Sequence, residues 1–157
     1  MITDKEREII RKVAVAERRN LVEKYCTYDL YGRCIEASDD IVRELKKYGM
    51  KATSHQGYCL FEYYENCTDQ PYADHVYTLY RKDGQTIYID VTLDQFQSQF
   101  EKEIPPVVLL DYIPNFILKH KPGYYSLASK MCGWKDYYDG KDYYNNFDYW
   151  GKGRLQP

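Results

Sequence analysis

The sequence predicts an α+β domain in which N-terminal helices pack on an antiparallel β-sheet. Two N-terminal stretches repeat apolar residues at steps of three and four, which is helical spacing. Further on, runs rich in aromatic and β-branched residues indicate strands, and Asp83-Gly84 joins two of these runs as a hairpin turn. A chain of 157 residues is long enough for a single domain. We expect its core over residues 3–120, followed by a Tyr- and Gly-rich segment over residues 121–157.

The composition excludes several classes of protein. The formal net charge is −2, so no overall positive field points to nucleic acid or to an anionic membrane. No apolar run approaches the ~18 residues needed to span a bilayer. The N-terminus lacks the apolar segment of a secretory signal, which predicts a cytoplasmic protein. The five cysteines are therefore expected to be reduced thiols.

Two helices are expected first. Residues 4–25 form a helix, in one piece or in two, with Thr3 and Glu6 as a capping box. Cys34 opens a second helix over residues 35–48, which Gly49 ends in the left-handed conformation. The inner stripe of this helix is expected to be Ile35, Ser38, Ile41, Val42, Leu45 and Tyr48.

Strands dominate the middle of the chain. Residues 52–64 are expected to form a strand, with a candidate bulge at Gly57. The hairpin runs over residues 75–92. A short amphipathic helix follows over residues 93–100, with Thr92 and Gln95 in a capping pattern. Residues 103–114 contain a buried strand or helix, and the sequence does not decide between the two.

The two-residue turn fixes the register of the hairpin. With Asp83 and Gly84 at its centre, Tyr77 faces Asp90. Because side chains alternate along a strand, His75 and Asp90 then lie diagonally on one face, within reach of a hydrogen bond. A slip of one residue would place them on opposite faces.

Cys34, His75 and Asp90 form a candidate catalytic triad. The Cys34 helix is expected to cover the hairpin face that carries Tyr77 and Tyr88, bringing the thiol toward His75. A helix N-terminus and an imidazolium both stabilise a thiolate, whose pKa starts near ~8.5. A carboxylate on the far ring nitrogen orients the histidine and supports its charge. This set of groups predicts attack on an acyl carbon through a thioester, without a cofactor.

These residues resemble a known family. Three stretches, GRCIEASDDIVRELKKYG, HVYTLY and GQTIYIDVTLDQF, place a Cys at a helix start, a His on a strand and an Asp on the next strand. Their order and spacing are similar to the transglutaminase-like branch of the papain-like cysteine enzymes, over about residues 31–96. The resemblance implies a papain-like or transglutaminase-like core, with Cys34, His75 and Asp90 as the triad. It also implies a peptidase, amidase, deamidase, transglutaminase or acyltransferase activity, acting on a protein or peptide.

The chain departs from this family in places. Arg33 stands where animal transglutaminases usually have tryptophan beside the cysteine. The signature around the cysteine of arylamine N-acetyltransferases is only partly matched by Gly32, Arg33 and Glu36. This partial match disfavours an acetyl-CoA enzyme. Two residues, Tyr28 and Gln56, are candidates for the second donor that would stabilise an oxyanion.

Other readings of these residues remain open. Asp94 is a rival to Asp90, and Cys34 alone would more often be a small buried residue. Cysteines and His55 could bind zinc, but seven residues separate Cys26 from Cys34, far from the tight spacing of structural zinc sites, so no metal is expected. The runner-up function is a non-catalytic module of the same fold that binds a protein or peptide through its tyrosines, of which there are 19.

Overall fold

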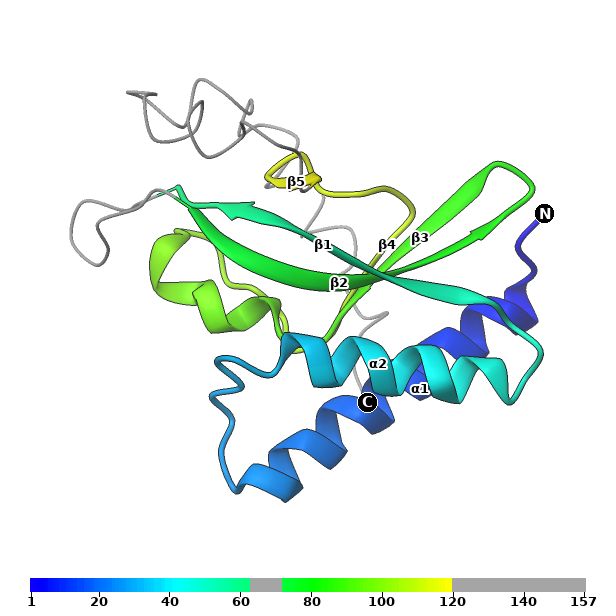
Figure 1. The fold of residues 1–157 in the computed structure, drawn as a ribbon, viewed down its shortest axis with the longest axis horizontal. Coiled ribbons are helices and arrows are strands. Elements are labelled where there is room, and N and C mark those ends of the chain that lie inside the picture. Colours follow the sequence, from blue (N-terminus) through cyan, green and yellow to red (C-terminus); the bar gives the residue numbers. More distant parts are fainter. Residues whose placement is uncertain (63–71, 120–157) are drawn as a thin grey trace.

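The computed structural model describes residues 1–62 and 72–119 (Figure 1). Its elements are α1 (Asp4–Tyr25), α2 (Cys34–Lys46), β1 (Ala52–Leu60), β2 (Tyr72–Lys82), β3 (Gln85–Asp90), η1 (Leu93–Gln99), β4 (Val108–Leu110) and β5 (Ile117–Lys119). The strands form one antiparallel sheet in the order β4-β3-β2-β1-β5. Both helices lie on one face of this sheet. The described part of the chain is thus α+β, as predicted, and the segment 121–157 lies outside it.

Helix α1 has the bounds that the sequence predicts and is a single helix. Its capping box is present: the Glu6 N–H donates to the Thr3 hydroxyl, and the Thr3 N–H donates to the Glu6 carboxylate. Ile10, Ala14 and Leu21 are buried along one side of the helix. This side packs on the core formed with α2 and the sheet.

Helix α2 begins at Cys34, as predicted, and ends at Lys46. Gly49 has a φ of 76°. The Gly49 N–H donates to the Lys46 carbonyl and the Met50 N–H donates to the Leu45 carbonyl, which is a Schellman arrangement. The local sequence therefore fixes the C-terminal end of α2.

The inner stripe of α2 is narrower than predicted. Ser38, Ile41 and Leu45 are buried, as expected. Ile35 and Tyr48, at the two ends of the predicted stripe, are instead 61% and 56% exposed. The helix is therefore rotated relative to the prediction, and Ala37 joins the buried face.

The β2–β3 hairpin has the predicted register. Asp83 and Gly84 both have positive φ, 52° and 77°, as a two-residue type I′ turn requires. Paired residues run from Lys82–Gln85 at the turn to Thr78–Ile89. The ladder ends at this last pair, although β2 itself continues to Tyr72. Beyond it, β2 and β3 separate.

Strand β1 differs from the prediction in two ways. It ends at Leu60, short of the predicted residue 64. Its register with β2 is unbroken through the Gly57–His75 pair, so Gly57 does not form a bulge with β2. Gly57 instead permits the close approach of β5, because a Cβ there would lie 2.1 Å from the Leu118 carbonyl oxygen.

The short elements after β3 also differ. Residues 93–99 form a 3₁₀ helix, and the Thr92 side chain does not cap it. β4 shows that the undecided stretch 103–114 contains a strand. β5 was not predicted, because three residues are too few to show a periodic pattern.

Helix α2 covers the opposite face of the hairpin from the one predicted. The Ser38 hydroxyl lies 2.7 Å from the hydroxyls of both Ser54 and Thr78, which belong to that opposite face. A buried hydroxyl needs a hydrogen-bond partner, and this face supplies two. The rings of Tyr77 and Tyr88 lie on the other face, 5.3 Å apart.

Candidate active site

His75 and Asp90 form a buried hydrogen-bonded pair. His75 Nε2 lies 2.5 Å from Asp90 Oδ2. The two residues are only 1% and 3% exposed. The hairpin places them on one face, in the diagonal relation expected from its register. The short distance is typical of a hydrogen bond that carries charge.

Two further residues hold the Asp90 carboxylate in place. The Tyr88 hydroxyl donates to Oδ2 at 2.6 Å. The Thr92 N–H donates to Oδ1 at 3.0 Å, and the Thr92 hydroxyl lies 3.4 Å from the same oxygen. Both carboxylate oxygens therefore have donors, which fixes the orientation of Oδ2 toward the imidazole.

Cys34 lies next to this pair, near the point where β2 and β3 stop pairing. The two strands stop pairing beyond Thr78 and Ile89. Cys34 packs near this end of the ladder, among residues that include Val76 of β2 and Asp90 of β3. A helix on one face of the sheet can thus present its first side chain to a histidine on the other face.

The start of α2 is suited to a negative charge. Cys34 is the first residue of the helix, and the preceding Arg33 makes no side-chain cap. The first N–H groups of an α-helix have no partner inside the helix. These free donors and the helix dipole favour an anion at the Cys34 position.

The electrostatics of Cys34 and His75 favour a thiolate beside an imidazolium. Burial raises the pKa of the Cys34 thiol, but the hydrogen bond and charge of His75 and the Val76 N–H outweigh it, so the net pKa is lowered. Burial lowers the pKa of His75, but the charge and hydrogen bond of Asp90, helped by Cys34, raise it to about 9. Each shift strengthens the other, as in an activated thiol.

The two ring nitrogens of His75 differ in their contacts. Nε2 is hydrogen-bonded to Asp90, whereas Nδ1 is buried and makes no well-aligned hydrogen bond to any of the described residues. The contact with Cys34 is therefore looser than the one with Asp90, although it shifts the pKa of both groups. Nδ1 is therefore the ring nitrogen that is not committed to Asp90.

Cys34 opens onto a cleft of about 720 Å³. The thiol is half-buried, whereas His75 lies beneath the surface. The ring of Phe96, 5.3 Å from the imidazole and edge-on to it, closes the site on the side of η1. The described residues that line the cleft are Tyr31, Gly32, Cys34, Phe61, Tyr72, Ala73, Asp74, Gln95, Phe96, Ser98 and Gln99.

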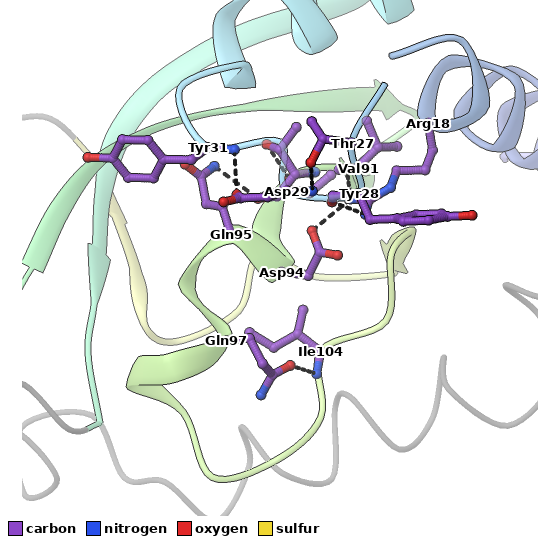
Figure 2. A network of polar contacts seen from close by, with 12 residues as sticks. Arg18, Thr27, Tyr28, Asp29, Tyr31, Val91, Asp94, Gln95, Gln97 and Ile104 are labelled. Carbon is purple, nitrogen blue, oxygen red and sulfur yellow. Dashed lines mark hydrogen bonds and ion pairs between the residues drawn. The ribbon is translucent and has the colours of Figure 1, made fainter. Parts of the chain in front are cut away.

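Arg18 ties the loop before Cys34 to the segment after Asp90 (Figure 2). Its guanidinium donates to the Tyr28 carbonyl at 2.9 Å, to the Val91 carbonyl at 2.9 Å and to Asp94 Oδ1 at 2.7 Å. Arg18 is 8% exposed, so these bonds are largely shielded from water. Asp94, the rival to Asp90, is therefore the partner of Arg18 and not of His75.

Gln95 makes a second connection between the same two segments (Figure 2). Its Oε1 accepts a hydrogen bond from the Gly32 N–H at 3.3 Å, and its Nε2 donates to the Thr92 carbonyl at 2.9 Å. Within the loop, the Tyr31 N–H donates to Asp29. The position of Cys34 thus depends on residues far away in the sequence.

The two candidate oxyanion donors lie away from the cleft. The Tyr28 side chain is 81% exposed and lies over a different hollow, next to Val15 and Pro106 of the described chain. Gln56 is exposed on β1, opposite Val76, and is not among the described residues that line the cleft. Neither residue has a contact with Cys34 that would support this role.

Sequence reasoning missed several residues of the site, of which Tyr88 and Gln95 are two examples. Tyr88 lies two positions before Asp90 on β3, so strand alternation alone puts both side chains on one face. Gln95 gave no such signal, because its contact with Gly32 joins two separate loops.

No metal site is formed by the described residues: they contain no group of three or more His, Cys, Asp or Glu side chains that could hold an ion. Among them, Cys26 is exposed and Cys59 is buried, and both are free thiols. Cys67, His120 and Cys132 lie outside residues 1–62 and 72–119. None of the helices within those two ranges is long and apolar enough to cross a membrane.

Comparisons with protein-family models, curated proteins and solved structures find no match to this chain. The resemblance to transglutaminase-like enzymes therefore rests on the sequence motifs alone. What the site does must be argued from its own geometry.

Proposed function

We propose that this protein is a cysteine-dependent acyl-transfer enzyme that acts on an amide through a thioester on Cys34. One observation carries the proposal. A buried histidine, His75, is held through Nε2 by Asp90, and its other nitrogen is left for a half-buried thiol at an uncapped helix start. Nucleophile, base and orienting group then stand in the order that covalent catalysis by a thiol requires.

The first half of the reaction forms the thioester. The Cys34 thiolate attacks the carbonyl carbon of the amide, and the C=O electron pair moves to oxygen. The free N–H groups at the start of α2 stabilise the resulting oxyanion. As the C–N bond breaks, the His75 imidazolium gives its proton to the leaving amine. The products are an acyl-thioester on Cys34, a free amine and a neutral imidazole.

The second half releases the acyl group. Water or a second amine attacks the thioester carbon, and neutral His75 takes the proton of the attacking group. The C–S bond breaks, and the electron pair returns to the Cys34 sulfur. Asp90 keeps its charge throughout and stabilises the imidazolium whenever it forms. No cofactor takes part in these steps.

The cleft supports a protein or peptide substrate. Its volume, about 720 Å³, accommodates a few residues of an extended chain. The rings of Phe61 and Tyr72 and the amides of Gln95 and Gln99 line it. Aromatic faces and neutral amides suit a peptide backbone or a glutamine side chain, which are themselves amides.

Alkylation with iodoacetamide tests the nucleophile, because the reaction needs a thiolate and no substrate. The full-length protein is treated at pH 7, and labelling of each cysteine is followed by peptide mass spectrometry. Exposure alone would make Cys26 react faster than the half-buried Cys34. We expect Cys34 to react at least about tenfold faster than Cys26, because ionisation outweighs access.

A matched pair of variants assigns this reactivity to the imidazole. His75→Ala is expected to slow Cys34 labelling to the rate of the other cysteines. His55→Ala removes an imidazole from the neighbouring strand and should leave the rate unchanged. Labelling of Cys34 that is no faster than that of the exposed Cys26 would rule out the enzyme and favour a binding module. The substrate class is tested by incubating the protein with peptide amides and measuring its intact mass. An added acyl group on the native protein that is absent from Cys34→Ser would identify the substrate class.

A further inference from the structure

Tyr88 and His75 share one oxygen atom of Asp90. The Tyr88 hydroxyl donates to Oδ2 at 2.6 Å, and His75 Nε2 lies 2.5 Å from the same Oδ2. Tyr88 is fully buried, and its ring packs against Tyr77. The Thr92 N–H meanwhile holds the other oxygen, Oδ1. Oδ2 thus serves two strong donors inside the protein.

An oxygen that accepts two hydrogen bonds binds each donor less tightly than an oxygen that accepts one. The phenol draws part of the carboxylate charge toward itself, so less remains to stabilise the imidazolium. This matters for a histidine that must release a proton to a leaving amine, because an acid works best when its pKa lies near the working pH. With Asp90 alone, a buried imidazolium would be held too firmly.

We propose that Tyr88 is a positioning residue of the thiol site, which by sharing Oδ2 with His75 limits how firmly Asp90 holds the imidazolium. Its role in turnover rests on the proposed function, whereas its effect on His75 does not. Burial raises the pKa of Tyr88 well above its usual range, so the phenol stays a neutral donor wherever His75 titrates. Thr92 keeps Asp90 oriented when the phenol is removed. A change in the pKa of His75 can therefore be assigned to the lost hydrogen bond and not to a reoriented carboxylate.

Several titratable groups face this pair and must be accounted for in any pH profile. Each comes from a different element packed around the carboxylate. They are Cys34 from α2, Cys59 from β1, Tyr77 from β2 and Asp94 from η1. Burial raises the pKa of Cys59 and of Tyr77, so both stay neutral over the pH range in which His75 titrates.

The test is an NMR titration of the histidine rings in the full-length protein. There are three histidines, and the His75 signal is assigned by its loss in His75→Gln. In wild type we expect this ring to titrate near pH 9. In Tyr88→Phe we expect its midpoint to rise by about one pH unit, because a hydrogen bond to a charged group is removed. Tyr77→Phe, which removes a neighbouring hydroxyl that does not bond to Asp90, should leave the midpoint unchanged.

A second variant covers the case in which Tyr88→Phe does not fold. Tyr88→3-fluorotyrosine keeps the size of the ring and makes the hydroxyl a stronger donor, so the His75 midpoint should fall. An unchanged or oppositely shifted midpoint in the folded variant overturns the proposal. The outcome is independent of alkylation: a shifted His75 with an unreactive Cys34 would refute the enzyme but keep the role of Tyr88.

Discussion

Replacing Asp90 with asparagine tests the electrostatic argument most directly. Asp90→Asn keeps the shape of the side chain and removes its charge. In the native protein burial lowers the pKa of His75, but the Asp90 charge and hydrogen bond, helped by Cys34, raise it from 6.5 to about 9. Without that charge, burial dominates, so the pKa of His75 falls below 6.5 and the ring is neutral at pH 7.

The effect on Cys34 follows from its own surroundings. Burial raises the pKa of the thiol above its ordinary value of 9.0, and it is chiefly the His75 imidazolium that reverses this. With a neutral ring, a thiol whose pKa is 9.0 or higher is ionised in at most about one molecule in a hundred at pH 7. We therefore expect alkylation of Cys34 at pH 7 to slow by at least about tenfold.

The rate of iodoacetamide labelling at Cys34, followed by peptide mass spectrometry, measures this effect. Asp111→Asn is the matched control, since it makes the same change in a partly exposed ion pair with Arg7. An Asp90→Asn rate within threefold of the wild-type rate, in a folded variant, would refute the reasoning. It would mean that the carboxylate does not hold the imidazolium.

Three further predictions concern stability and are measured by urea unfolding. Gly57→Ala should lower the free energy of unfolding by about 2 kcal/mol, because its Cβ would meet the Leu118 carbonyl; an unchanged midpoint would contradict the close approach of β5. Burial, with Asp40 beside it, raises the pKa of Glu17 to about 9, so native stability falls as pH rises from 4.5 to 9. Glu17→Gln should therefore raise the free energy of unfolding by about 2 kcal/mol at pH 7 and by almost nothing at pH 4. Equal effects at both pH values would argue against a neutral Glu17 carboxyl in the native protein. Arg18→Met should cost about 3 kcal/mol, because it leaves a carboxylate and two carbonyls without their donor, and a loss below about 1 kcal/mol would show that water replaces it.

Local signals predicted the helices and the hairpin. Thr3 and Gly49 mark helix ends through hydrogen bonds within a few residues. The residue types at neighbouring positions are enough to predict such bonds. Asp83 and Gly84 fix the register of β2 and β3, because a two-residue turn allows only one pairing. The relation of His75 to the end of β3 follows from that register.

The side of the sheet that α2 covers could not be read in the same way. Both faces of the hairpin are apolar enough to receive a helix. Ser38 decides between them through Ser54 and Thr78, which come from two other elements.

The supporting residues of the site were also hidden in the sequence. Arg18 binds Asp94 across 76 positions of the chain. Tyr28 supplies its backbone carbonyl to that network, and its side chain lies over a different hollow from the Cys34 cleft. Contacts of this kind leave no periodic pattern, so only the folded chain reveals them.

The early end of the β2–β3 ladder has a consequence for how this protein can evolve. Strand pairs lengthen readily, because each added rung satisfies two backbone groups. A longer ladder past Thr78 and Ile89 would add backbone hydrogen bonds, but it would draw β2 and β3 together at the point where Cys34 lies next to His75. If Cys34 is the nucleophile that we propose, stability and reactivity place opposite demands on these few backbone positions.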